Sequence, residues 1–376
     1  MRKDQKIKAL FVTGDLPPLY SGRTKNDLFL IGKCLKNNID IDVLAAVYPN
    51  IIYDEIIDPV KLIRIETKQE LYRFVFPLKT LMILIKNKYK VIRFRGYSFE
   101  YALITFFTKK FYPKCKIIIQ PAKYGGDDPQ SILNRKSGFG YNQSKIFLTK
   151  NPVARNIYFP VSQENKNRLR NKLHIPVGSI IFITVGIFHQ RKNQALITEA
   201  FIEALKTVGK NMYLLHIGPT HNDLIRMKEN PKTINFAKTE EQRVKNLIRN
   251  NNVSKNVEVI GKVDNPEEYY KASDILIHMS LSEGEANVVN EAMACGIPCI
   301  LPNSPLYSDQ SPGNCSYKIN SIDVHNLSKS IKLLSENNKL RKSLGENSAE
   351  FVRLNRDPKI VAKQYIKKIK SLFDAP

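Results

Sequence analysis

The sequence lacks any uninterrupted apolar run approaching the roughly 18 residues that a membrane-spanning helix requires. The first 15 residues, MRKDQKIKALFVTGD, also lack the apolar core and small-residue cleavage site of a signal peptide. We therefore expect a cytoplasmic protein that does not cross the membrane.

Cysteine is scarce as well. The five cysteines are odd in number and scattered along the chain, at Cys34, Cys115, Cys295, Cys299 and Cys315. This distribution is more typical of reduced thiols than of a disulfide framework. Cys295 and Cys299 are close in sequence, but no second Cys or His pair with metal-ligand spacing accompanies them. We expect structural thiols at these positions.

Acidic residues are outnumbered, 35 against 59 Lys and Arg, which gives a formal net charge of +24. The excess is larger in the N-terminal part, where residues 1–160 hold 28 basic and 13 acidic residues. The stretch from residue 79 to residue 116 has Glu100 as its only acid. Its basic residues are Lys79, Lys86, Lys88, Lys90, Arg93, Arg95, Lys109, Lys110, Lys114 and Lys116. Such a surface attracts the phosphates of nucleic acid or anionic lipid, although an ordinary solvated surface rich in lysine remains the alternative.

Short apolar runs, each followed by a turn and a helical pattern, recur along the 376 residues. They comprise KALFVT (8–13), VIRF (91–94), KIIIQ (116–120), IIFITVG (180–186), MYLLHIG (212–218), VEVIG (257–261), DILIHM (274–279) and PCILP (298–302). This alternation predicts α/β domains with doubly wound parallel sheets. We expect an N-terminal domain at 1–160, a C-terminal domain at 161–355, and a final helix at 356–376 that packs back toward the N-terminal domain.

The segment SEGEANVVNEAMACGIP (282–298) carries two glutamates at the point where a parallel strand ends, which is the sheet edge at which ligands bind. Glu283 is expected in the loop beside Gly284, and Glu291 one turn into a helix capped by Asn287. The N–H groups and dipole at the start of that helix suit a diphosphate. Carboxylates on either side could accept hydrogen bonds from hydroxyl groups, as a nucleotide-sugar would offer.

A second turn from strand to helix, VGIFHQRKN (185–193), places Arg191 and Lys192 just before an Asn193 cap. Two cations there could neutralise a diphosphate leaving group, which is the electrostatic help that glycosyl transfer requires. Each turn taken alone could instead be an ordinary connection with surface charges, whereas two such turns in one domain favour a binding site.

These motifs resemble the retaining glycosyltransferases of the GT-B fold that carry a Glu-x7-Glu motif. The resemblance covers roughly residues 175–370, through ITVGIFHQRKNQALITEAF, LLHIGP, NVEVIGKVDNPEEYYKASDILIHMSLSEG and ANVVNEAMACGIPCILPN. A weaker resemblance in the N-terminal part rests on KALFVTGDLPPLYSGRTKNDLFLIGKCLKNNIDIDVLA. The family resemblance as a whole implies two facing Rossmann-like domains.

The resemblance also implies roles for individual residues. Glu291 would hold the ribose hydroxyls, Glu283 and the loop amides the donor sugar, and Lys192 the diphosphate. The donor-binding set is then Gly22, Arg191, Lys192, Glu283, Gly284, Asn287, Val288 and Glu291, with Glu283 and Lys192 as the catalytic candidates. A retaining member of the family needs no metal, cofactor or covalent nucleophile.

The sequence departs from the family pattern in several places. Ile187 stands where members often have an arginine, and Glu285 adds a negative charge after the first glutamate of the motif. All six histidines lie at His174 or beyond, so the usual N-terminal histidine is absent. About twenty residues separate Asp128 from Asn151, where members carry a strand, a helix and a strand, so the N-terminal domain is expected to be shortened.

The leading interpretation is therefore a hexosyl- or N-acetylhexosaminyl-transferase that acts on a glycan or a lipid-linked glycan precursor. Its partners would be a nucleotide-sugar donor, that acceptor and the anionic inner face of the cytoplasmic membrane. The alternatives are a non-catalytic nucleotide-binding or scaffold homologue and a nucleotide-sugar epimerase. Nucleic acid is not an expected partner, because the basic stretch lacks aromatic platforms within a recognised module.

Overall fold

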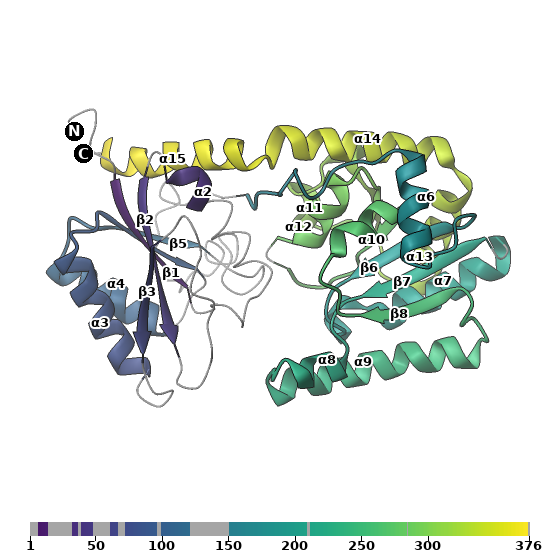
Figure 1. The fold of residues 1–376 in the computed structure, drawn as a ribbon, viewed down its shortest axis with the longest axis horizontal. Coiled ribbons are helices and arrows are strands. Elements are labelled where there is room, and N and C mark those ends of the chain that lie inside the picture. The colour runs from purple at the N-terminus through teal and green to yellow at the C-terminus, as the bar shows by residue number, and fades with distance from the viewer. Residues whose placement is uncertain are drawn as a thin grey trace. The chain divides into compact units, whose positions relative to one another are not determined.

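The computed structural model describes residues 7–13, 32–36, 39–47, 61–66, 72–95, 99–120, 150–208, 211–283 and 285–374. The chain forms two compact α/β units, one of Met1–Ala154 with Arg356–Pro376 and one of Arg155–Asn355 (Figure 1). None of the helices in these ranges has the length and apolar character needed to span a bilayer.

The N-terminal unit contains a sheet of five parallel strands in the order β3-β2-β1-β4-β5. The strands are β1 (Ile7–Thr13), β2 (Ile39–Val47), β3 (Lys61–Glu66), β4 (Val91–Arg95) and β5 (Lys116–Gln120). Among the described residues before Ala154, the helices of this unit are α2 (Gly32–Leu35), α3 (Tyr72–Lys86) and α4 (Phe99–Phe111). Strands β1, β4 and β5 confirm the predicted runs at 8–13, 91–94 and 116–120. The expected shortening between Asp128 and Asn151 falls almost wholly outside the described residues.

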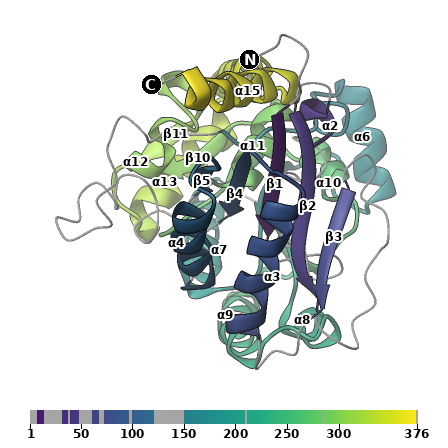
Figure 2. The ribbon, with the colours of Figure 1, turned by 90° about the vertical axis from the view of Figure 1, so that its left-hand side faces the viewer.

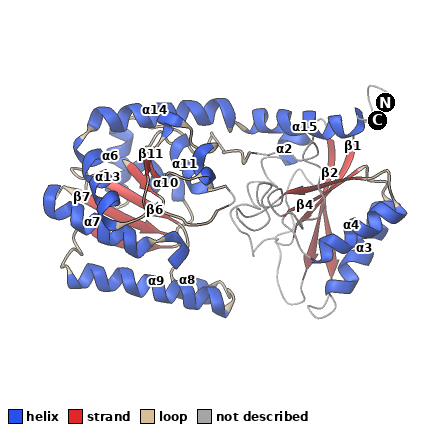
Figure 3. Ribbon diagram, turned by 180° about the vertical axis from the view of Figure 1, so that it is seen from behind, coloured by secondary structure: helices blue, strands red, loops and turns tan. Residues whose placement is uncertain are grey.

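Alternating side chains of β1 pack on opposite faces of this sheet, as successive residues of a strand do. Leu10 and Val12 join a core with α3 and α4, whereas Ala9 and Phe11 face the C-terminal helix α15 (Pro358–Asp374). The Tyr365 ring of α15 meets the Phe11 ring edge-on at 6.2 Å. Figure 3 shows α15 beside α2, so the last helix of the chain completes the N-terminal core.

The C-terminal unit contains a sheet of six parallel strands in the order β11-β10-β9-β6-β7-β8. The strands are β6 (Ile180–Val185), β7 (Met212–Ile217), β8 (Val257–Gly261), β9 (Ile275–Ile277), β10 (Cys299–Pro302) and β11 (Tyr317–Ile319). The helices are α6 (Gln163–Lys172), α7 (Gln194–Val208), α8 (His221–Arg226), α9 (Pro231–Asn250), α10 (Pro266–Ala272), α11 (Asn287–Ala294), α12 (Pro305–Ser308), α13 (Val324–Glu336) and α14 (Asn338–Asn355). The prediction of α/β domains with doubly wound parallel sheets is confirmed.

The strand order of this sheet reverses between β6 and β9. From β6 the chain adds β7 and β8 on one side, and then returns to add β9, β10 and β11 on the other. The loops that follow β6 and β9 therefore leave the same edge of the sheet in opposite directions. A crevice forms at such a switch point beyond the carboxyl ends of the strands, and ligands of open α/β sheets bind there.

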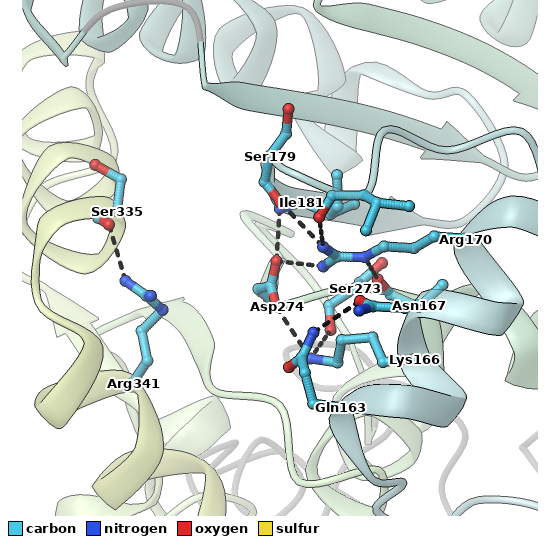
Figure 4. A network of polar contacts seen from close by, with 12 residues as sticks. Gln163, Lys166, Asn167, Arg170, Ser179, Ile181, Ser273, Asp274, Ser335 and Arg341 are labelled. Carbon is cyan, nitrogen blue, oxygen red and sulfur yellow. Dashed lines mark hydrogen bonds and ion pairs between the residues drawn. The ribbon is translucent and has the colours of Figure 1, made fainter.

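At the amino ends of β6 and β9, an ionic network joins the sheet to α6 (Figure 4). Asp274, directly before β9, pairs with Arg170 of α6 at 2.6 Å and with Lys166 of the same helix at 3.0 Å. It also accepts a hydrogen bond of 2.8 Å from the backbone N–H of Ile181 in β6. Burial opposes ionisation of Asp274, but Lys166 and Arg170 outweigh it and lower the pKa. The network joins α6 to the amino ends of the two strands that frame the switch point.

Candidate functional site

Two glycines lie at the carboxyl ends of the neighbouring strands β6 and β7. Gly186 follows β6 with φ +146, and Gly218 follows β7 with φ +141, a backbone region that favours glycine. A Cβ atom at Gly218 would overlap the Gly186 carbonyl oxygen. The chain can therefore turn sharply out of both strands without side chains filling the space above them.

Hydrogen bonds join the loop after β6 to the loop after β9. The N–H of Leu281 donates to the Arg191 carbonyl oxygen at 3.0 Å, and Asn193 Nδ2 donates to the Met279 carbonyl oxygen at 2.9 Å. Arg191 Nη1 also donates to the Ser282 carbonyl oxygen. Asn193 adopts a left-handed conformation, with φ 57, between a short 3-10 turn and α7. These contacts fix the two loops against each other at the switch point.

Lys192 and Glu283, the two catalytic candidates, form an ion pair between these loops, in which Lys192 Nζ donates to Glu283 Oε1. The same oxygen accepts a hydrogen bond of 2.8 Å from Ser280 Oγ and lies 3.7 Å from Arg191 Nη1. The Glu283 side chain is only 2% exposed. Burial opposes ionisation, but Lys192 and its neighbours outweigh it and lower the pKa of Glu283 to about 2. Glu283 is therefore a carboxylate at neutral pH.

His278 also belongs to this group, although no sequence motif indicates a role for it. Its Nε2 lies 3.8 Å from Glu283 Oε1 and makes no hydrogen bond within the described residues. Burial lowers the pKa of His278 to about 3, so the ring is neutral. The Tyr307 ring stands perpendicular to it at 5.9 Å. The available signal was the strand period of two, since His278 and Ser280 alternate with apolar residues at the end of DILIHMS.

Glu291 lies in α11, where Tyr270 of α10 donates a hydrogen bond of 3.0 Å to its carboxylate. Burial raises the pKa of Glu291 to about 7, and the nearby Glu267 adds to this, although the Tyr270 hydrogen bond opposes it. The hydrogen-bond partner of Glu291 thus comes from α10 and not from the Lys192–Glu283 group. The two glutamates of the motif occupy different electrostatic environments, one fully ionised and one that titrates near neutrality.

The start of α11 differs by one residue from the prediction. Asn287 is the first helical residue and not the cap; Ala286 occupies the cap position, without a side-chain capping bond. The reason is a tertiary contact, because Gln310 accepts from the Ala286 N–H at 3.2 Å and donates to the Ala286 carbonyl oxygen at 2.6 Å. Asn287 and Val288 therefore form the first turn, at the positive end of the helix dipole.

Glu285 accepts a hydrogen bond of 3.0 Å from Asn290 Nδ2, so one of its oxygens is turned to α11. Ile187, at the other departure from the family pattern, packs against the apolar cluster of Phe188 and Leu224. Gly22 and Gly284, two of the predicted donor-binding residues, lie outside the described residues. Within the described ranges, no group of three or more His, Cys, Asp or Glu side chains is arranged to hold a metal ion.

The two doubly wound parallel sheets and the switch-point site define an α/β protein of the GT-B class. Residues 165–351, about half of the chain, match the family described as glycosyl transferases group 1, and the chain belongs to this family.

Individual relatives are more distant. The N-acetyl-alpha-D-glucosaminyl L-malate synthase of Bacillus anthracis is 24% identical over 170 residues, which cover 45% of this chain and only 39% of that enzyme. Sucrose-phosphate synthase from Thermosynechococcus elongatus superposes with a TM-score of 0.77 and 17% identity, covering 99% of this chain and all of its own. Anabaena HepE, in complex with UDP-glucose, superposes with a TM-score of 0.73 and 14% identity, covering 97% of this chain and all of its own. At these identities the solved structures show the shared fold.

Proposed function

We propose that the protein is a retaining glycosyltransferase that moves a sugar from a nucleotide-diphosphate sugar to a glycan or lipid-linked glycan precursor. The observation that carries the proposal is the Lys192–Glu283 pair, because it lies between the loops after β6 and β9 at the switch point of the sheet. Membership of the group 1 family supports the reaction class. The UDP-glucose bound by HepE and the name of the Bacillus anthracis relative support a hexosyl or N-acetylhexosaminyl donor.

In this proposal the diphosphate of the donor binds near the first turn of α11 and the two cations of the β6 loop. Arg191, with a third of its side chain exposed, and Lys192 would face the negative charge that grows on the diphosphate as the glycosidic bond breaks. Glu283 would accept a hydrogen bond from a hydroxyl of the sugar. Before the donor binds, the contact with Lys192 keeps Glu283 ionised, so the carboxylate is ready to accept that hydrogen bond.

Glu291 would hold the ribose hydroxyls. Because burial raises its pKa to about 7, a protonated fraction exists at neutral pH. The protonated form can donate a hydrogen bond as well as accept one. The reaction proposed here proceeds with retention on one face of the sugar, with no metal and no covalent nucleophile, and the protein acts in the cytoplasm at the inner face of the membrane.

A second candidate is a non-catalytic homologue that binds the nucleotide only. The observation that favours it is the absence of any histidine before His174, since family members place a histidine of the N-terminal domain near the donor sugar. The two candidates share the nucleotide site and differ in whether a sugar is released.

Calorimetric titration of UDP, GDP and ADP tests the nucleotide site that both candidates require. We expect one of these diphosphates to bind, and its affinity to fall in Lys192→Ala and stay unchanged in Lys206→Ala. Lys206 is a matched control, because it pairs with Glu203 on the exposed surface of α7, away from the two loops. If none of the three diphosphates binds, the proposed site is wrong.

A further inference from the structure

Helix α3 presents large apolar side chains on its outer face as well as on its inner face. Its inner face contributes Phe76 and Leu84 to the core of the N-terminal sheet. The outer row, here named the α3 ridge, consists of Phe74, Leu78, Met82 and Ile85, with exposed fractions of 67%, 58%, 69% and 45%. Spacings of four, four and three residues place these side chains on one helical face. Large apolar side chains on both the inner and the outer face are unusual for a helix at a protein surface.

The neighbouring helix α4 also carries exposed aromatic side chains. Figure 2 shows α3 and α4 next to each other over one face of the N-terminal sheet, and their inner side chains share one core. Phe99, Phe106 and Phe111 of α4 are 63%, 61% and 57% exposed. The Lys110 ammonium lies 5.6 Å from the centre of the Phe111 ring. Apolar and basic side chains are thus interleaved at the end of α4.

Lysines surround these apolar side chains, and exposed acids are missing from the same elements. The described residues 72–95 and 99–120 contain one acidic residue, Glu100, which is buried. The exposed lysines of these helices and the turns after them are Lys79, Lys86, Lys88, Lys109, Lys110 and Lys114. A partner of this surface must therefore offer both an apolar phase and a negative charge.

We propose that the outer faces of α3 and α4 dock on an anionic phospholipid bilayer, with the α3 ridge and the α4 phenylalanines in the acyl-chain boundary and the lysines on the headgroups. Amphipathic surfaces with Phe and Leu flanked by Lys bind membranes in this way. A protein partner fits less well, because lysine is depleted in protein–protein interfaces. The basic sequence alone predicts attraction by charge; the exposed ridge adds an apolar contribution that salt does not screen.

This inference deepens the proposed function, on which the location at the inner face of the membrane rests, by assigning the side chains that make the contact. The test is flotation of the whole protein with vesicles of phosphatidylcholine alone or mixed with phosphatidylglycerol, at low and high salt. We expect wild type to bind the mixed vesicles and to keep part of that binding at high salt, because only the charge contribution is screened.

Two variants separate the contributions. Leu78→Gln with Met82→Gln should lower the partition coefficient for mixed vesicles by about ten-fold or more, at high salt as well as low. Lys109→Gln with Lys110→Gln should lower it at low salt only. Ile225→Gln is the matched control, since Ile225 is 54% exposed in the other unit and should change nothing.

An unchanged melting temperature and unchanged nucleoside diphosphate affinity would show that the variants are folded. The proposal is overturned if wild type ignores the mixed vesicles, or if the Leu78 and Met82 substitutions leave the partition coefficient unchanged. If wild type binds the mixed vesicles but none of the nucleoside diphosphates, the proposed function is contradicted and the docking surface stands.

Discussion

The Lys192 ammonium and the Glu283 carboxylate form a buried ion pair across the boundary at which the C-terminal sheet reverses its strand order. Each residue sits in the first loop after its own strand, so the pairing follows from the topology: β6 and β9 are neighbours in space although they are far apart in sequence. The ion pair therefore orients both side chains before a donor contacts them.

Replacement of Lys192 by Ala should lower turnover more than donor affinity. The ammonium gains most when charge accumulates on the departing diphosphate, and interactions that strengthen in the transition state act on kcat. The loss expected for one such group is about 100-fold or more in kcat. Steady-state kinetics beside Lys206→Ala measures it. A loss confined to KM would make Lys192 a binding residue only.

Glu283→Gln tests the depressed pKa of the buried carboxylate. The pKa of Glu283 in the folded protein is about 2, below the ordinary value of 4.5. The ionised carboxylate therefore stabilises the fold above pH 4.5, and this contribution is lost as the pH falls toward 2. The difference in unfolding free energy between wild type and variant should therefore be largest at pH 5 and above and shrink with acid. Denaturant unfolding at a series of pH values gives this difference, with the exposed Glu203→Gln as control. A difference that is constant with pH would refute the assignment.

Glu291→Gln should have the opposite pH dependence. The folded pKa of about 7 exceeds 4.5, so the folded state binds the extra proton, and wild type loses stability as the pH rises through this window. The variant, which cannot ionise, should become more stable relative to wild type as the pH rises from about 4.5 to about 7. Because a hydrogen bond to a charged group contributes about 1.5 to 3 kcal/mol, it should also bind the nucleotide roughly ten-fold or more weakly. Equal nucleotide affinity would remove Glu291 from the site.

The sequence predicts the elements and residues whose chemistry is local. Apolar runs predict β1 and β4 to β10, and the polar loops after β6 and β9 contain the candidates Lys192 and Glu283. Strands β2, β3 and β11 are not among these runs. Charged residues interrupt β2 and β3, and β11 has only three residues with Lys318 at its centre.

Contacts between distant segments could not be foreseen in the same way. Gln310 hydrogen-bonds to both backbone groups of Ala286, which takes the cap position expected for Asn287, and the Tyr270 hydroxyl donates to Glu291. Both partners come from other helices or loops, and no spacing within the SEGEANVVNEAMACGIP segment indicates them. His278 directly follows β9 and is a lone histidine at the end of an apolar run, which by itself indicates no chemistry.

Gly345→Ala should destabilise the C-terminal unit. In an ordinary helix this change stabilises by roughly 0.5 to 1 kcal/mol. Here a Cβ on α14 would overlap the carbonyl oxygen of Gly296, which follows α11, so we expect a net loss of about 1 to 3 kcal/mol. Gly178→Ala is the matched control, because a Cβ there has no neighbour within 4 Å. Denaturant unfolding gives the unfolding free energy of both variants. We expect it to fall in Gly345→Ala and not in Gly178→Ala.

Product analysis with a labelled sugar shows whether this site transfers a sugar. The donor is the one whose nucleotide binds in the titration, and the acceptor is a crude membrane-lipid extract. We expect label in the lipid or glycan fraction with the donor's anomeric configuration retained. This label should be lost in Lys192→Ala and kept in Lys206→Ala. Nucleotide binding with neither transfer nor hydrolysis of the donor would contradict the proposed transfer and identify a binding protein.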